Sequence, residues 1–333
     1  MSSGSSWRRF AVRLLGVSLV SLFVPAAAPA AASAGTSWRI VDLGAGEDSV
    51  AVAVNDRGHV LGTRSGTPFL WRDGRITELD PLPNGFLQVT DVNNRDEVVG
   101  WAFANTDFDV HAYLWRRGTM TDLGVLPGGS HSYAAAINDR GDVVGYSETA
   151  GGPHAFRWRE GVLTDLGGDP VTDYSVAHGV NNTGQIVGEW GDGNYSALPV
   201  RWWHGNRLLL TSERAGATAV NERGHIIGSY QIESGAFERG FLWRSGRFSP
   251  IDPPAGATYF VVRNINDHDH VVGFSANGYS DVSGAVWQDG QARKLPKLGD
   301  RAEAYDINDR DQIAGYSTTG PDGRDTRAVL WVR

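Results

Sequence analysis

The chain has 333 residues, and its 38 aspartates and glutamates outnumber its 30 lysines and arginines, so the formal net charge is −8 at pH 7. This acidic balance argues against nucleic acid as a partner, because phosphate backbones bind surfaces rich in Lys and Arg. The sequence contains no cysteine, which excludes disulfides, thiol catalysis and cysteine-ligated metals.

The first 34 residues have the composition of a secretory signal peptide. Three arginines within 8–13 precede an apolar run at 14–24, and a segment rich in Ala and Pro ends at Ala34. Small residues at the end of such a segment are typical of a cleavage site, and the apolar run is too short to cross a bilayer as a helix. We therefore predict cleavage after Ala34 and a secreted, extracellular protein with no membrane span. The remaining domain, 35–333, is expected to be a monomer with a net charge of −11 once the three arginines are removed.

The predicted domain begins with a single strand that has no hairpin partner beside it. The segment 37–44 reads SWRIVDLG and resembles the stretches 120–124 and 163–167, MTDLG and LTDLG, which lie at the ends of internal repeats. The first strand therefore has the pattern of a last strand.

The repeats are clearest at 134–167, where alternating apolar residues form four short strands joined by turns that contain Asp and Gly. This pattern is typical of antiparallel hairpins. The unit recurs at steps of 38 to 45 residues, the period of a four-stranded propeller blade. In every copy the first strand ends in Val or Ile followed by an asparagine, a glycine follows seven residues later, and the third strand carries a tryptophan. The asparagines are Asn55, Asn93, Asn138, Asn181, Asn221, Asn266 and Asn308, and positions below are counted from them. The tryptophans are Trp71, Trp115, Trp158, Trp202, Trp243, Trp287 and Trp331.

The end of the chain decides between an open and a closed array. The seventh copy stops at Arg333, directly after its third strand, so the strand at 38–43 is expected to complete it. An open solenoid would need capping repeats, whereas a closed ring hides its strand edges by radial repetition. The sequence predicts an all-β fold: a seven-bladed β-propeller of four-stranded antiparallel blades, with the last blade completed by the N-terminal strand.

The repeat pattern resembles the HAF-repeat extracellular proteins of bacteria. The naming tripeptide stands at His154-Ala155-Phe156, with a near copy at His111-Ala112-Tyr113, and each is followed by the T-D-L-G stretch. The resemblance covers the whole predicted domain. It implies an exported repeat protein with a propeller fold, and it brings no catalytic residues.

The turn after each asparagine carries Gly or Asp at position +3, where a left-handed backbone is expected. Position +4 holds His, Glu, Asp or Gln, and we interpret this variety as a solvated strand start. The run Asp267-His268-Asp269-His270 could bind a metal, but it occupies this ordinary turn. With no zinc, P-loop, dinucleotide or serine-nucleophile motif in the chain, we predict no metal, no cofactor and no catalytic residue.

The candidate binding site lies at one mouth of the central channel. The loops before the first strands and between the second and third strands are long and differ between repeats, and variable loops on a rigid scaffold are a usual place for function. At positions −3 and −2, three repeats carry small or aliphatic residues and the others carry polar ones that would converge near the axis. The predicted ligand-binding residues of the channel mouth and loops are Asp91, His178, Arg263, Asn264, Tyr305, Asp306, Trp101, Trp190 and Tyr195.

Three functions are compatible with this pattern. The first is a non-catalytic binding propeller that holds a glycan, peptide or envelope component, since aromatic residues in the loops suit stacking on sugar rings. The second is a hydrolase or lyase acting on polysaccharides or esters, with Asp91, His178, Arg263, Tyr305 and Asp306 as its polar groups. The third is a structural or interaction role without a small ligand. Because propellers serve all three, the fold does not choose, and the absence of a paired-carboxylate or triad motif favours the first.

Overall fold

The structure, a computed structural model, describes residues 37–79, 87–104, 108–167, 174–191, 197–230, 238–278, 280–320 and 325–333. The expected signal peptide lies outside these ranges. All regular elements of the described residues are β-strands, and the described part of the chain contains no apolar helix of membrane-spanning length.

The strands form seven antiparallel sheets of four strands each, which we number as blades in chain order. Blade 1 consists of β2 Ser49–Val54, β3 Val60–Arg64, β4 Thr67–Arg72 and β5 Arg75–Glu78. Blade 2 consists of β6 Leu87–Val92, β7 Val98–Phe103, β8 Val110–Arg116 and β9 Thr119–Asp122. Blade 3 consists of β10 Ser132–Ile137, β11 Val143–Thr149, β12 Gly152–Arg159 and β13 Val162–Asp165. Blades 4 and 5 consist of β14 Tyr174–Val180, β15 Ile186–Gly191, β16 Leu198–Trp203 and β17 Asn206–Leu209; and β18 Ala215–Val220, β19 Ile226–Tyr230, β20 Arg239–Arg244 and β21 Arg247–Ile251. Blade 6 consists of β22 Tyr259–Ile265, β23 Val271–Asn277, β24 Ser280–Gln288 and β25 Gln291–Lys294, and blade 7 of β26 Ala302–Ile307, β27 Ile313–Thr319, β28 Asp325–Val332 and β1 Arg39–Asp42.

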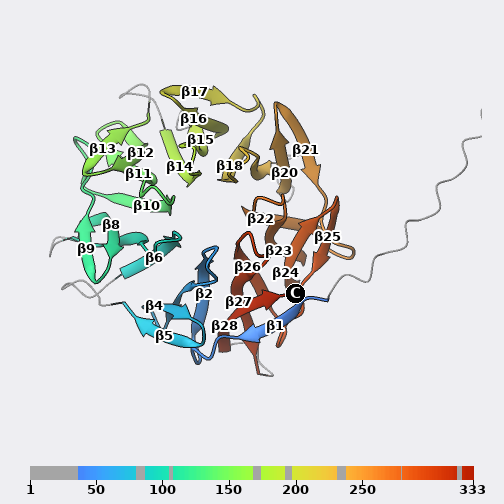
Figure 1. Cartoon of the computed structure of the whole chain (residues 1–333). Helices are drawn as coiled ribbons and strands as arrows, with labels where there is room; N and C mark the ends of the chain where they lie inside the picture. Colours follow the sequence, from blue (N-terminus) through green and yellow to red (C-terminus); the bar gives the residue numbers. More distant parts are fainter. Residues whose placement is uncertain are drawn as a thin grey trace, which may run out of the picture. The chain divides into compact units, whose positions relative to one another are not determined.

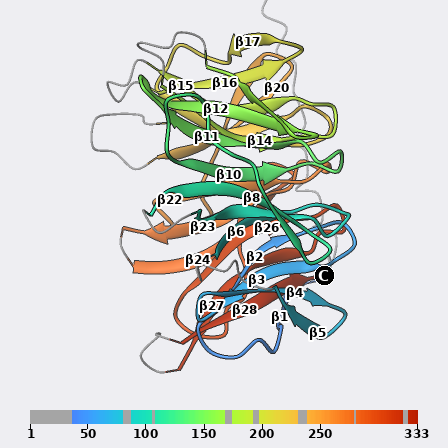
Figure 2. The same cartoon turned by 90° about the vertical axis from the view of Figure 1, so that its left-hand side faces the viewer.

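The seven sheets are arranged as a ring with the first strand of each blade innermost (Figure 1). These first strands contact one another around the full circle, including the contact of β2 with β26 that joins blade 1 to blade 7. Figure 2 views the ring from the side, where neighbouring blades stack face against face. The prediction of a seven-bladed propeller is confirmed.

The N-terminal strand closes the ring. β1 pairs antiparallel with β28 as the outermost strand of blade 7, with Ile40 opposite Trp331, and the blue and red ends of the chain meet there in Figure 1. Trp38 and Ile40 pack against the apolar cluster between blades 6 and 7. The predicted completion of the last blade by the N-terminal strand is confirmed.

The repeated glycine at +7 has a steric cause. In all seven blades it lies opposite a carbonyl of the first strand, and a Cβ on Gly145 would stand 1.9 Å from the carbonyl oxygen of Tyr133. The first strand is distorted beside it: the pairing register shifts across one residue, at position −3, in every blade. Such a β-bulge inserts an extra residue and re-aims its side chain. Each innermost strand therefore carries a bulge at the same height in the channel.

Apolar side chains fill the spaces between blades. Leu114 of blade 2 packs with Phe156 and Trp158 of blade 3, and Trp331 of blade 7 packs with Val272 of blade 6. The indole N–H of Trp202 donates to the carbonyl of Leu166 in the preceding blade at 2.9 Å. Large aromatic side chains bury much area at such contacts, so the tryptophan of each repeat stabilises the joint between blades.

The histidine of the HAF tripeptide has a structural partner within its own blade. Nδ1 of His154 lies 2.9 Å from Oδ2 of Asp165 in the T-D-L-G stretch, and Oδ1 of the same aspartate accepts the N–H of Gly167. His111 and Asp122 make the same pair in blade 2 at 2.8 Å. The two motifs therefore recur together because they join the third strand to the fourth.

Candidate functional site

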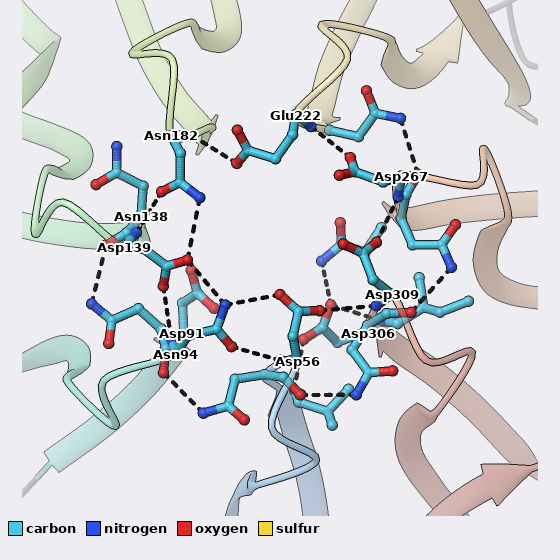
Figure 3. Close-up of a pocket in the computed structure, with 18 of the residues that line it drawn as sticks. Asp56, Asp91, Asn94, Asn138, Asp139, Asn182, Glu222, Asp267, Asp306 and Asp309 are labelled. Atoms are coloured by element: carbon cyan, nitrogen blue, oxygen red, sulfur yellow. Dashed lines mark hydrogen bonds between the residues drawn. The ribbon is translucent and has the colours of Figure 1, made fainter.

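The end of the channel formed by the asparagine turns is a closed ring of hydrogen bonds (Figure 3). Nδ2 of each motif asparagine donates to the backbone carbonyl of the next asparagine around the ring, at 2.8 to 3.0 Å, and the last of these bonds runs from Asn308 back to Asn55. Oδ1 of each asparagine accepts the N–H groups at +2 and +4, as with Arg140 and Asp142 for Asn138. Only an amide side chain donates and accepts in this way, which explains why the asparagine never varies.

A second ring lies beside the first. The side chain at position +1 accepts the backbone N–H of the +1 residue in the preceding blade, at 2.7 to 2.9 Å, and this pattern also closes around all seven blades. The residues of this ring are Asp56, Asn94, Asp139, Asn182, Glu222, Asp267 and Asp309. Their side chains lie around a small cavity of about 170 Å³, the turn-side cavity, and Figure 3 shows them converging on its centre.

The turn-side cavity is strongly acidic. Its lining includes the five carboxylates of the second ring together with Asp91 and Asp306, and no lysine or arginine. Burial raises the pKa of Glu222, and the charges of Asp267 and Asp139 act in the same direction. Burial and the nearby Asp267 and Asp56 likewise raise the pKa of Asp309. These carboxylates accept the backbone N–H groups that join the blades, so their arrangement is explained by ring closure.

The opposite end of the channel, on the side of the long variable loops, contains a larger cavity. This loop-side cavity has a volume of about 620 Å³, within the range of small-molecule binding sites. The bulged −3 residues Val52, Thr90, Ala135, His178, Thr218, Arg263 and Tyr305 all line it. Because the bulges are at one height, seven side chains of six types face one space.

Most of the predicted site residues meet in this cavity. Asp91, His178, Arg263, Asn264, Tyr305, Asp306 and Trp101 line it. Tyr195 lies outside the described residues. The two acidic residues also line the turn-side cavity, so they lie between the two spaces, at the floor of the larger one.

Trp190 does not belong to the group. We expected it in a surface loop, but it is a half-buried residue of β15, paired with Leu198. It packs against the cluster between blades 3 and 4, with the guanidinium of Arg207 4.2 Å from the centre of its ring. Its environment is therefore that of a packing residue. Trp101 is also a strand residue, in β7, but its neighbours lie in the cavity.

The three polar −2 residues, Asp91, Asn264 and Asp306, join neighbouring blades. Oδ2 of Asp91 accepts the N–H of Ile137 in blade 3 at 2.8 Å, and Oδ2 of Asp306 accepts the N–H of Val54 in blade 1 at 2.7 Å. Nδ2 of Asn264 donates to Oδ1 of Asp306, which links blades 6 and 7. The polar −2 side chains therefore satisfy backbone donors at position −1 and link neighbouring blades.

Both carboxyl groups at the cavity floor are difficult to ionise. Burial, with the charge of Asp306, raises the pKa of Asp91 to about 7. Burial likewise raises the pKa of Asp306 to about 6, against the hydrogen bonds from Val54, Ile307 and Asn264. Desolvation favours the neutral form of a carboxyl group, so at neutral pH the floor carries less negative charge than two free aspartates would.

The −3 residues have neighbours of a different kind. Nε2 of His178 lies 3.5 Å from Oε1 of Glu189 within its own blade. The guanidinium of Arg263 lies 5.5 Å from the ring centre of Phe274 and 5.8 Å from that of Tyr305. Burial and the charge of Glu303 raise the pKa of Tyr305, which keeps its hydroxyl protonated as a donor. These three side chains offer hydrogen bonds and a positive charge to the cavity.

One wall of the cavity is aromatic, and sequence reasoning found only part of it. Trp101 packs edge-on against Tyr133 with ring centres 5.5 Å apart, and Tyr133 stacks on Tyr146 at 4.8 Å. Both tyrosines line the cavity. Tyr133 stands at −5 of blade 3 and Tyr146 at +8. Trp101 stands at +8 of blade 2, and this shared position is the signal that could have identified Tyr146.

Position +4 is buried in four blades and half-buried in the other three, so our interpretation of it as a solvated strand start was wrong. His59, Glu97, Asp142 and Gln185 are each at most 9% exposed. Histidine at +4 always faces aspartate at +3 of the next blade: the pairs are His59 with Asp96, His225 with Asp269 and His270 with Asp311, at 2.6 to 2.7 Å. Where +4 is not histidine, the next blade has glycine at +3. The two positions are therefore chosen together.

The histidine–aspartate pairs also explain the Asp267–His270 run. Asp267 belongs to the second ring, while Asp269 and His270 pair with the neighbouring blades on either side. Burial by itself would raise the pKa of Asp96, but the hydrogen bond from His59 and the charge of Arg72 outweigh it and lower the pKa. The hydrogen bond from His270 does the same for Asp311.

Comparison with known proteins identifies the fold and no family. No protein-family model matches the chain, and no curated protein matches it. Among solved structures, it is similar to the propeller domain of the Trilobed protease from Pyrococcus furiosus, described as having an open velcro topology, with a TM-score of 0.58, 11% identity, and coverage of 86% of this chain and 93% of that one. It is also similar to a puromycin hydrolase variant, with a TM-score of 0.54, 15% identity, and coverage of 88% of this chain and 51% of that one. TolB from Acinetobacter baumannii matches with a TM-score of 0.48, 9% identity, and coverage of 71% and 64%. The chain thus spans less than two thirds of the TolB and hydrolase chains, and at these identities the likeness concerns the fold alone.

Proposed function

We propose that this chain is a secreted, non-catalytic binding propeller that holds an extracellular ligand in the loop-side cavity. The observation that carries the proposal is the contrast within each first strand. The asparagine at the end of the strand never varies, whereas the bulged residue three positions before it differs widely between blades and faces one cavity of about 620 Å³. Side chains that differ between otherwise identical units are the ones that symmetry and packing leave free for recognition.

A glycan is the ligand that this cavity suits best. The stacked Tyr133 and Tyr146, with Trp101 against them, form an aromatic wall, and aromatic faces can stack on the apolar faces of sugar rings. The far side of the ring carries the amide of Asn264 and the hydroxyl of Tyr305, and the imidazole of His178 lies in blade 4, beside the aromatic wall. Polar groups of this type fix the orientation of a bound molecule.

The proposal is tested by binding of the protein to a glycan and cell-wall-fragment array, followed by substitution. His178→Ala and Arg263→Ala should each weaken binding by about 1–3 kcal/mol if the side chain hydrogen-bonds the ligand, with little change in melting temperature. Arg140→Ala is the matched control, because Arg140 is an exposed residue of an asparagine turn at the other end of the channel. Loss of binding in the control but not in the cavity variants would contradict the proposed site.

The alternative, a hydrolase or lyase at the same cavity, is favoured by one observation. Asp91 and Asp306 have pKa values raised to about 7 and about 6, and carboxyl groups tuned in this way serve as acids and bases. Against it, every oxygen of the two carboxyl groups already accepts a backbone N–H. Incubation of any array ligand with the protein, followed by chromatography, separates the alternatives: an unchanged ligand supports binding, and cleavage that Asp91→Asn abolishes supports the enzyme.

A further inference from the structure

The loop-side cavity contains one permanent positive charge. Arg263 is the only lysine or arginine among the residues that line it, and its side chain is exposed. Among the described residues, no carboxylate forms an ion pair with this guanidinium. Most arginines near the turns behave differently: Arg72 lies 3.1 Å from Asp96, and Arg157 lies 2.9 Å from Asp142.

The position of Arg263 is set by its neighbours. It is the bulged residue of β22, and the rings of Phe274 and Tyr305 flank its guanidinium at 5.5 and 5.8 Å. Cation–π contacts hold a guanidinium without using its N–H donors. The planar fork of donors therefore remains available for an acceptor that comes from outside the protein.

The chemistry of the cavity limits what that acceptor can be. Guanidinium pairs with carboxylate or phosphate in a bidentate manner. Only one fixed cation is present, and the floor contains Asp91 and Asp306, with the acidic turn-side cavity beyond. A phosphate monoester carries close to two negative charges and would be repelled by the acidic channel more strongly than a singly charged carboxylate, so a carboxylate fits better than a phosphate monoester.

The aromatic wall lies across the channel from Arg263. Trp101, Tyr133 and Tyr146 belong to blades 2 and 3, and in a ring of seven blades these are opposite blade 6, as Figure 1 shows. A ligand that meets both walls has to span the cavity, with a sugar ring at the aromatic wall and a carboxylate at the arginine. An oligosaccharide meets this requirement better than a single sugar.

We infer that the ligand of the loop-side cavity is an acidic oligosaccharide, whose uronic-acid carboxylate binds Arg263 while a neighbouring sugar ring packs against the aromatic wall of Trp101, Tyr133 and Tyr146. This inference rests on the proposed binding function and adds the class of ligand to it. Arg263 then determines specificity for charge, and the aromatic wall determines specificity for the ring.

The test compares each acidic oligosaccharide with its own methyl ester, since esterification removes the charge and leaves the sugars unchanged. Oligomers of galacturonate, glucuronate and mannuronate, and their esters, are titrated into the full protein by calorimetry. For at least one of them the acid should bind the wild-type protein about 10- to 100-fold more tightly than the ester. Arg263→Gln should make acid and ester equal, and Arg263→Lys should keep part of the preference, because lysine retains the charge without the bidentate fork.

Two controls and three possible outcomes separate failure of this inference from failure of the binding function. Arg140→Gln should leave the preference unchanged, and the melting temperatures of all variants should be compared first. An ester that binds as tightly as the acid, with both weakened in His178→Ala, would overturn the anionic ligand and leave the binding function standing. Binding only of peptides with a free C-terminal carboxylate, lost in Arg263→Gln, would overturn the saccharide. Binding of none of these probes, nor of any array glycan, would count against both proposals.

Discussion

The two ends of the channel are built from the same seven strands, yet they obey different rules. At the turn end, the side chains at 0 and +1 form two closed rings of hydrogen bonds, and every blade contributes the same kind of contact. At the loop end, only three or four residues earlier, the −3 side chains are Val, Thr, Ala, His, Thr, Arg and Tyr. The turn end is therefore the part that holds the ring together, and the loop end is the part that evolution can alter at little cost in stability.

The largest effect is expected from opening the ring itself. Removal of residues 35–44 deletes β1 and exposes the edge of β28, which would otherwise pair with it over four residues. An unpaired apolar edge strand promotes aggregation, and the cluster around Trp331 loses Trp38 and Ile40. We expect a protein that aggregates or melts many degrees lower. An unchanged melting temperature with monomeric elution would show that closure contributes little.

The next largest effect is expected from breaking one link of the asparagine ring. Asn138→Ala removes a buried acceptor used by the N–H groups of Arg140 and Asp142, and a donor to the carbonyl of Asn181. Each buried polar group left without a partner costs about 1–3 kcal/mol, so the free energy of unfolding should fall by about 3–5 kcal/mol. His178→Ala, in the other half of the channel, should cost less than about 1 kcal/mol. Equal losses in denaturant titrations would erase the distinction between the two ends.

A smaller effect on stability is expected from a change in pH. It comes from Asp91 and Asp306, the two carboxyl groups that lie between the two cavities. Asp91 has a folded-state pKa of about 7, above its ordinary value of 3.8, so between these values the folded protein binds a proton that the unfolded chain has lost. The resulting stability is present at low pH and is lost as the pH rises through 7. From pH 8 to pH 5 the free energy of unfolding should therefore rise by about 1–3 kcal/mol.

Asp91→Asn should reduce this rise, and the remainder should come from Asp306, whose pKa is raised to about 6. The control is Asp281. Hydrogen bonds from Lys294 and Lys297 lower the pKa of this aspartate to about 2, so Asp281→Asn should leave the stability profile between pH 5 and pH 8 unchanged. A profile that is flat in the wild-type protein would show that Asp91 is ionised throughout.

The sequence revealed the repeated residues of the turn end, the asparagine at 0 and the glycine at +7, because each blade repeats the same local requirement. Asparagine is needed at position 0 because its side chain bridges two blades, and glycine is needed at +7 because a Cβ there would meet a carbonyl oxygen. Both residues therefore appear seven times and are visible as a pattern. Closure by β1 followed from the same logic. A requirement that is repeated can be recognised without a structure.

The loop end was predicted only in part, for physical reasons that particular residues illustrate. The bulge at −3 accepts alanine as well as arginine, so it has no sequence signature. Yet the bulge decides which side chains of the innermost strands face the cavity. Tyr133 and Tyr146 were missed because their contacts with each other and with Trp101 join different strands and blades, which sequence spacing does not show. Trp190 was misplaced because β15 extends to Gly191, beyond the strand end that the turn residues indicated.

The smallest effect on the free energy of unfolding is expected at the paired positions +3 and +4. These residues lie at the turn end of the channel but vary between blades, so they test the contrast between the two ends. Asp96→Gly gives blade 2 the residue that four other blades carry, and its backbone φ of 60° suits glycine. It also removes the acceptor of His59 and a partner of Arg72, so we expect a loss of about 1–2 kcal/mol in unfolding free energy.

The second substitution decides whether the loss comes from the pair. Between blades 7 and 1, Gln312 faces Gly58 so closely that a Cβ on Gly58 would stand 2.8 Å from its Oε1, so glutamine at +4 and glycine at +3 form the alternative pair. The double variant His59→Gln with Asp96→Gly should therefore recover most of the stability that Asp96→Gly loses. His59→Gln alone should be destabilising, because the new glutamine side chain would face the Cβ of Asp96. Chemical denaturation of the wild type, both single variants and the double variant measures this coupling, expected at about 1 kcal/mol or more. If the two single losses simply add, then the three histidine–aspartate pairs coincide by chance and position +4 carries no information about the neighbouring blade.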